Sequence, residues 1–191
     1  IEAFAELLNE ERLEVPRHVM VQVAEPTRES VIGYSEIRDR VDGLVGVVNG
    51  AYGLVGQPAI NYLHRSQSIE ELVALYLAAD VMLVTPVRDG MNLVCKEFIA
   101  ARTDDTGVLV LSEFTGAAEA LGSALLINPY DTDGLKNAID RAVHLPEADV
   151  RRRMELLRES VMTNDVYAWA HSWMVALGIE SEHGDDAGAP S

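Results

Sequence analysis

The 191-residue sequence has a single cysteine, Cys95, and few basic residues. One cysteine cannot form an internal disulfide bond, and the absence of paired Cys or clustered Cys and His residues argues against a structural zinc site. The 15 Lys and Arg residues face 31 Asp and Glu residues, so the formal net charge is −16. This charge repels a phosphate backbone at long range, and we therefore expect no nucleic-acid partner.

Long apolar runs are also absent. No stretch approaches the ~20 consecutive apolar residues of a membrane span, and Ile1 to Glu11 lacks the basic-then-apolar layout of a secretory signal. We expect a cytoplasmic protein that does not bind membranes. The 48% hydrophobic content and the length are sufficient for the buried core of one domain.

Short apolar runs alternate with amphipathic stretches up to about residue 145. This pattern predicts an α/β, Rossmann-like fold in which helices cover both faces of a parallel sheet. The expected strands are Val19–Ala24, Ile60–Leu63, Val81–Thr85, Val108–Leu111 and Ala124–Ile127.

The helical stretches show apolar residues at three- and four-residue spacing. One such face runs from Val31 to Val48, and Gly50 is expected to end that helix. Two helices after Pro146 are expected to cap the domain, with Trp169 and Trp173 on a buried face. The domain then covers residues 1–178, and the acidic, small-residue segment 179–191 is expected to be disordered.

One loop is a candidate ligand site, because ligands of parallel sheets bind beyond the carboxyl ends of the strands. The strand Val81–Thr85 runs into Asp89-Gly90-Met91-Asn92 and then into an apolar helix. Asp89 could cap this helix, Gly90 allows close approach of a ligand, and the free amides suit a phosphate or a sugar. Glu97, two turns further, could accept hydrogen bonds from a ribose. The alternative is that Asp89 only caps and Glu97 only pairs with Lys96 or solvent.

Other candidate residues are weaker from the sequence alone. The five histidines show no metal-ligand spacing, so no metal site is expected. Cys95 lies among apolar residues and is expected to pack rather than react. Arg28 follows a strand end, where a surface arginine and an anion ligand are both consistent with the pattern.

The run from Ala79 to Phe98, ADVMLVTPVRDGMNLVCKEF, closely resembles the signature of the trehalose-6-phosphate synthase family. Three further stretches agree in order: Val48–Gly53, Gly107–Ala118 and Asn128–Asp131. The resemblance extends from about Ile1 to Leu177.

The resemblance implies a retaining glycosyltransferase built from two Rossmann-like lobes, the GT-B arrangement. Such an enzyme transfers glucose from a nucleotide sugar to glucose 6-phosphate, giving trehalose 6-phosphate, with no cofactor and no metal in the chemical step. The chain looks like the second, donor-binding lobe. The implied donor is UDP-glucose, with ADP-glucose and GDP-glucose as alternatives, and the implied partners are an N-terminal lobe and further copies in a homo-oligomer.

The resemblance also assigns residue roles. Asp89 would be the catalytic-site residue that engages the glucosyl hydroxyls, Glu97 would hold the ribose, and the backbone around Gln67 would face the base. Arg28 would bind the acceptor phosphate, which favours the anion ligand over the surface arginine. The rest of the donor-binding run would line the sugar and phosphates: Gly90, Met91, Asn92, Leu93, Val94, Cys95 and Lys96.

Several family features are not found in this sequence. The family's Arg and Lys that clamp the donor pyrophosphate, and its first-lobe histidine, have no counterpart. The strand that precedes helix Glu2–Leu8 in the family, central in a doubly wound sheet, also has no counterpart, so we expect a gap in the sheet. We expect the chain to be part of a longer polypeptide or to pair with another. Other GT-B enzymes, such as glycogen or sucrose synthases, and a non-catalytic regulatory or truncated homologue are the alternative functions.

Overall fold

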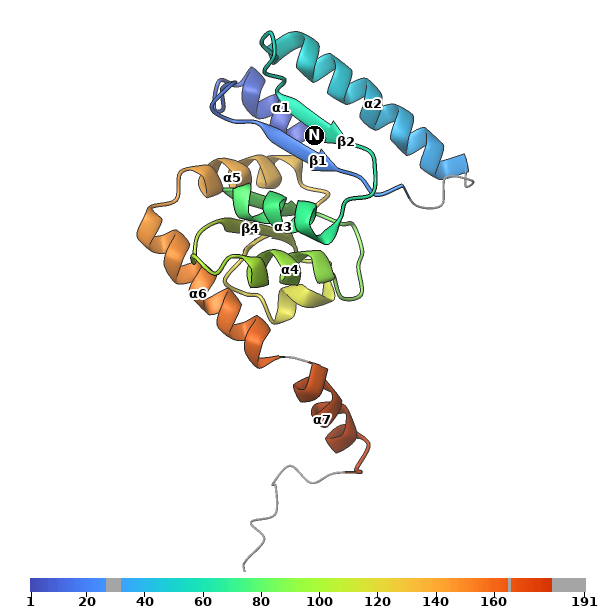
Figure 1. Cartoon of the computed structure of the whole chain (residues 1–191), viewed down its shortest axis with the longest axis vertical. Coiled ribbons are helices and arrows are strands. Elements are labelled where there is room, and N and C mark those ends of the chain that lie inside the picture. Colours follow the sequence, from blue (N-terminus) through green and yellow to red (C-terminus); the bar gives the residue numbers. More distant parts are fainter. Residues whose placement is uncertain (27–31, 165, 180–191) are drawn as a thin grey trace, which may run out of the picture.

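The computed structural model describes residues 1–26, 32–164 and 166–179. Helices alternate with strands along most of this length (Figure 1). Arg28 and most of the acidic C-terminal segment lie outside the described residues. In chain order the elements are α1 (Glu2–Asn9), β1 (Met20–Val23), α2 (Ile32–Tyr52), β2 (Ile60–Leu63), α3 (Ile69–Ala78), β3 (Val81–Val84), α4 (Leu93–Ala101), β4 (Val108–Ser112), the 3-10 helix η1 (Gly116–Glu119), β5 (Leu125–Ile127), α5 (Thr132–Val143), α6 (Glu147–Thr163) and α7 (Val166–Ala176).

The five predicted strands are confirmed, each to within one residue at either end. All strand pairs are parallel, but they form two sheets rather than one, with orders β1-β2 and β3-β4-β5. Every residue of β4 is buried, as expected for a central strand covered on both faces. The α/β class is therefore confirmed, with parallel pairing throughout.

The expected gap lies between β1 and β3, which do not pair. A cavity of about 350 Å³ occupies this position. Side chains from both strands and from two flanking helices line it, among them Phe4, Met20, Gln22, Leu83, Leu135 and Ile139. The sheet expected from the sequence is thus divided at one place, and the cavity lies at this division.

The β1-β2 sheet with α1 and α2 forms one half of the molecule, and the β3-β4-β5 sheet with its helices forms the other. Helix α5 joins these two halves, because it packs against α1 as well as β4 and β5 (Figure 1). Lys136 of α5 is only 8% exposed and its ammonium group contacts Glu10 at 2.7 Å, Glu6 at 2.9 Å and Asp133 at 3.0 Å. These hydrogen bonds, with Glu10 the strongest, raise the pKa of Lys136. The Lys136 cluster, consisting of these four residues, fixes α1 and hence β1 against the larger sheet.

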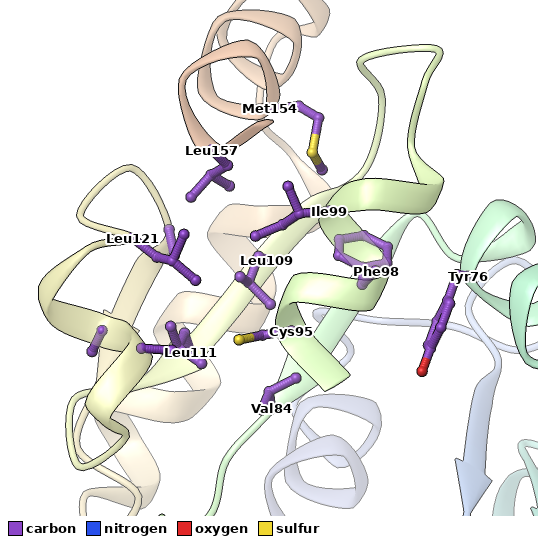
Figure 2. Packing of buried hydrophobic residues seen from close by; sticks show 13 residues of the cluster. Tyr76, Val84, Cys95, Phe98, Ile99, Leu109, Leu111, Leu121, Met154 and Leu157 are labelled. Atoms are coloured by element: carbon purple, nitrogen blue, oxygen red, sulfur yellow. The ribbon is translucent and has the colours of Figure 1, made fainter. Parts of the chain in front are cut away.

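The larger core lies between the β3-β4-β5 sheet and the helices α3, α4 and α6 (Figure 2). Phe98, Leu109, Leu111, Met154 and Leu157 are among its buried side chains. Burial of side chains this size stabilises the fold by about 1.5–3 kcal/mol each. This core holds α4, and therefore the loop in front of it, on the sheet.

Two expectations about helices are wrong. Helix α2 does not end at Gly50 but continues to Tyr52, because a glycine costs a helix only about 1 kcal/mol. The Asn49 side chain also anchors this stretch, accepting from the Ile60 N–H at 2.8 Å and donating to the Ile60 carbonyl at 2.9 Å. Trp173, expected on a buried face, is 56% exposed, because α7 extends away from the core.

In the part of the chain that the structure describes, no helix is both long and apolar enough to cross a membrane. Nor do three or more His, Cys, Asp or Glu side chains gather in the described ranges so as to hold a metal ion.

Candidate functional site

The candidate loop spans residues 85–92 and connects β3 to α4 at the carboxyl edge of the larger sheet. It is bonded to the loop that follows β4. The Asp89 N–H donates to the Phe114 carbonyl at 3.2 Å, and the Gly116 N–H donates to the Asp89 carbonyl at 3.1 Å. These bonds form a parallel bridge between Asp89 and Thr115. Two loops that are distant in sequence therefore support one another.

Gly116 is required at this junction. A Cβ atom built there would overlap the carbonyl oxygen of Gly90. In the sequence, Gly116 belongs to the family-like stretch Gly107–Ala118, where no role for it was predicted. The available signal was its place one turn after a buried strand, where a glycine often marks close backbone approach.

The N-cap of α4 is Asn92, and the expectation that Asp89 caps this helix is wrong. The Asn92 side chain accepts from the Cys95 N–H at 2.9 Å, and its backbone has a φ of 66°. Asn is among the few residues that tolerate this left-handed conformation and also cap well. Asp89 lies three residues before this N-cap, and its carboxylate bonds within the loop instead of to the first turn of the helix.

Asp89 is instead held by the loop. Its carboxylate accepts from the Asn92 amide at 3.0 Å and from the Met91 N–H at 3.1 Å. These bonds, with that from Asn92 the strongest, lower the pKa of Asp89. A carboxylate acceptor has about four lone-pair sites, so two donors leave capacity for a ligand hydroxyl. Asp89 is thus an anchored, ionised acceptor at the carboxyl edge of the sheet.

The first turn of α4 presents both amides and apolar surface. Within the described residues, the N–H groups of Leu93 and Val94 have no protein acceptor. The side chains of Met91, Leu93 and Val94 are exposed. This combination suits a ligand with a phosphate and an apolar or stacking part. Lys96 follows and is half-buried.

Cys95 has a different place. Its side chain is 0% exposed and lies in the core (Figure 2), and burial raises the pKa of its thiol. Its N–H is already bonded to Asn92. Cys95 therefore packs in the core next to the loop and presents no group to a ligand in this structure. This is the packing role that its apolar neighbours in the sequence predicted.

Glu97 contacts neither Lys96 nor another cation among the described residues. Its Oε2 atom accepts from the hydroxyl of Tyr76 at 3.0 Å. The Tyr76 side chain comes from α3 and packs edge-on against Phe98, with ring centroids 6.3 Å apart. Burial, followed by the bond to Glu97, raises the pKa of Tyr76 to about 12. The sequence patterns assigned Tyr76 no role and missed this contact, although a tyrosine among aliphatic residues is a signal of a polar partner.

Gln67 lies after β2, directly before Ser68, the N-cap of α3. Its side-chain amide donates to the Arg65 carbonyl at 2.9 Å.

The structure thus brings Asp89, Met91 and Asn92 together by direct bonds and joins Glu97 to α3. It shows no hydrogen bond from Gln67 to any of them within the described ranges. None of residues 89–97 lines the cavity between the sheets.

Comparisons with known proteins agree on one family. The family model of Glycosyltransferase family 20 matches residues 1–178. A trehalose-6-phosphate synthase of Mycolicibacterium smegmatis is 49% identical over 185 residues, which make up 97% of this chain and 37% of that protein. One from Mycobacterium leprae is 51% identical over 177 residues, 93% of this chain and 36% of that protein.

Solved structures agree as well. The UDP-forming synthase of Burkholderia xenovorans in complex with glucose 6-phosphate aligns with a TM-score of 0.86 at 37% identity, over 92% of this chain and 39% of that one. The E. coli protein bound with UDP-2-fluoro glucose aligns with a TM-score of 0.83 at 37% identity, with the same coverage. The chain spans little more than a third of the curated relatives it matches. With the fold, the loop and these relatives in agreement, the chain belongs to glycosyltransferase family 20, the family of the trehalose-6-phosphate synthases.

Proposed function

We propose that this chain supplies the donor-binding lobe of a glycosyltransferase that moves glucose from UDP-glucose to glucose 6-phosphate, giving trehalose 6-phosphate. The observation that carries the proposal is the loop of residues 85–92 with its helix. It holds an ionised Asp89, unpaired amides at Leu93 and Val94, and the Glu97 carboxylate along one helix. A nucleotide sugar carries the matching groups: sugar hydroxyls, two phosphates and ribose hydroxyls.

Each group has a chemical role in this proposal. Asp89, fixed by two hydrogen bonds, accepts hydroxyls of the glucosyl ring and so orients it. The amides at the start of α4, together with the positive end of the helix dipole, stabilise the negative charge that develops on the leaving diphosphate. Glu97 accepts from the ribose hydroxyls. The exposed Leu93 and Val94 side chains border the phosphates and limit access of water.

The acceptor half of the reaction rests on similarity alone. The B. xenovorans relative was solved with glucose 6-phosphate, and Arg28, the proposed phosphate ligand, lies outside the described residues. We propose that retention of configuration and the remaining contacts depend on an N-terminal lobe, supplied by the same or another polypeptide. The cytoplasmic location and the homo-oligomer remain predictions.

The test is calorimetric titration of the chain with UDP and UDP-glucose, followed by ADP-glucose and GDP-glucose to define the base. Glu97→Ala should weaken UDP binding by about 1–3 kcal/mol, the cost of leaving hydroxyl partners unpaired. Glu155→Ala is the matched control, since Glu155 is an exposed acid on α6, away from the loop. A folded chain that binds none of these nucleotides, or equal UDP affinity in wild type and Glu97→Ala, would contradict the proposal.

A further inference from the structure

We propose that Tyr76 is a positioning residue that orients Glu97 toward the ribose, so that the lobe prefers a ribonucleotide to a dideoxyribonucleotide. The inference rests on the proposed function, because it concerns the same donor site. No role for Tyr76 follows from the sequence motifs, which end upstream at Gly53 and resume at Ala79. It follows from the hydrogen bond between Tyr76 and Glu97.

The geometry leaves Glu97 available to a ligand. The Tyr76 hydroxyl donates to Oε2 at 3.0 Å. An ionised carboxylate accepts at both oxygens, so Oε1 and part of Oε2 remain free for two neighbouring hydroxyls. Glu97 itself is exposed on the surface of α4, where its side chain otherwise has several rotamers. A donor on one oxygen restricts these rotamers before the ligand arrives, which lowers the entropy lost on binding.

Tyr76 is itself held firmly enough to act in this way. Its side chain is 7% exposed and packs against Phe98 at the margin of the core, with its hydroxyl directed away from the other labelled side chains (Figure 2). Its backbone is tied to α4 by the buried Arg102, whose guanidinium donates to the Tyr76 carbonyl at 3.0 Å and to the Leu77 carbonyl at 2.5 Å. Side chain and backbone therefore both fix the hydroxyl relative to Glu97.

The chemistry of the donor also fits a positioning role. A Lys or Arg in place of Tyr76 would neutralise Glu97 and compete with the ligand for its oxygens. A tyrosine with a pKa of about 12 stays neutral at ordinary pH and donates one hydrogen bond only. Hydroxyl donors bind a charged acceptor more strongly than a neutral one, so a neutral partner beside Glu97 suits a site for ribose hydroxyls better than a cation would.

The experiment is calorimetric titration of wild type and Tyr76→Phe with UDP and with 2′,3′-dideoxy-UDP. Phenylalanine keeps the ring and its packing on Phe98 and removes only the hydroxyl. We expect Tyr76→Phe to bind UDP about three- to tenfold more weakly and dideoxy-UDP unchanged, so that the preference for the ribonucleotide falls. In a Glu97→Ala background, Tyr76→Phe should cause no further loss of UDP affinity.

Tyr52→Phe is the matched control. The Tyr52 hydroxyl donates to Asn9 at 3.4 Å in the other half of the molecule, so its removal should change neither affinity. Equal losses for both nucleotides in Tyr76→Phe would indicate a merely structural role and overturn the proposal, as would no loss for either. If wild type and Glu97→Ala differ for UDP while Tyr76→Phe matches wild type, the positioning role fails and the donor-site proposal stands. If Tyr76→Phe does not fold, Tyr76→Leu takes its place, since it also removes the hydroxyl and keeps an apolar side chain beside Phe98, and the same loss of preference for UDP over dideoxy-UDP is required of it.

Discussion

Gly116 lies so close to the carbonyl oxygen of Gly90 that any side chain at position 116 would overlap it. The loop after β4 thus limits how closely the loop that carries Asp89 can approach it. Because the Gly116 N–H also bonds to the Asp89 carbonyl, displacement of one loop must displace the other.

Gly116→Ala should therefore lower nucleotide affinity without any direct contact to the nucleotide. The added methyl group forces a backbone shift, and we expect the free energy of unfolding to fall by about 1–3 kcal/mol together with weaker UDP-glucose binding. Gly122→Ala is the control, because a Cβ there meets nothing within 4 Å. Calorimetry and urea unfolding of both variants check the prediction, which fails if Gly116→Ala behaves like Gly122→Ala.

Two substitutions of Asn92 should distinguish the stability that comes from its side-chain hydrogen bonds from the stability that depends on its backbone conformation. Asn92→Ala and Asn92→Gly both lose the bond to the Cys95 amide and the bond to Asp89. Only alanine also bears the cost of a φ of 66°, which is about 1–2 kcal/mol for a residue with a Cβ. We expect the alanine variant to unfold at lower urea concentration than the glycine variant. Equal midpoints would mean that the left-handed conformation costs nothing at this position.

Alkaline pH should reveal the burial of Tyr76. Its pKa is raised from 10 to about 12 in the folded protein, so the neutral phenol is favoured on folding. The stability that this provides is complete below pH 10 and is lost as the pH rises toward 12. The free energy of unfolding of wild type should therefore fall toward that of Tyr76→Phe across this window. Lys136 is present in both proteins, so its contribution cancels in the difference between their free energies of unfolding. A constant difference between pH 9 and about 12 would contradict the raised pKa.

The Lys136 cluster should hold the two halves together. Lys136→Met leaves Glu6, Glu10 and Asp133 close together without their shared cation, and we expect a clear loss of stability that added salt reduces. Arg151→Met is the control, since the ion pair of Arg151 among the described residues is an exposed one with Glu147 within α6. Urea unfolding at low and high salt measures both. Equal effects of the two substitutions would show that the cluster does not couple α1 to α5.

The sequence predicted the strands well because β3, β4 and their neighbours are short apolar runs between polar residues, a pattern that survives in any context. The family resemblance also predicted a gap in the sheet, and the structure shows that this gap lies between β1 and β3. The sequence predictions were wrong where three-dimensional geometry determines the outcome. Capping by Asn92 rather than Asp89 depends on one φ angle. Continuation of α2 past Gly50 depends on the hydrogen bond between Asn49 and Ile60.

The candidate site shows the same contrast. The run from Asp89 to Glu97 is local in sequence and could be found by its motif. The contact between Tyr76 and Glu97 joins residues 21 positions apart, and the contact between Gly116 and Gly90 joins two loops. A local pattern can indicate that such a residue has a close neighbour, but not which residue that neighbour is. Arg28 lies outside the described residues, so its role stays a prediction.

The division of the sheet has a consequence for handling the chain in solution. Strands β1 and β3 each turn one hydrogen-bonding edge toward the cavity between the sheets, where no described strand pairs with it. Unpaired edges are templates for strands of other molecules. A single extended segment placed between them would close both edges at once, whereas copies that meet at high concentration would pair edge to edge. At high concentration the unpaired backbone edges of Met20–Val23 and Val81–Val84 should therefore favour association of this chain, against the repulsion from its net charge of −16.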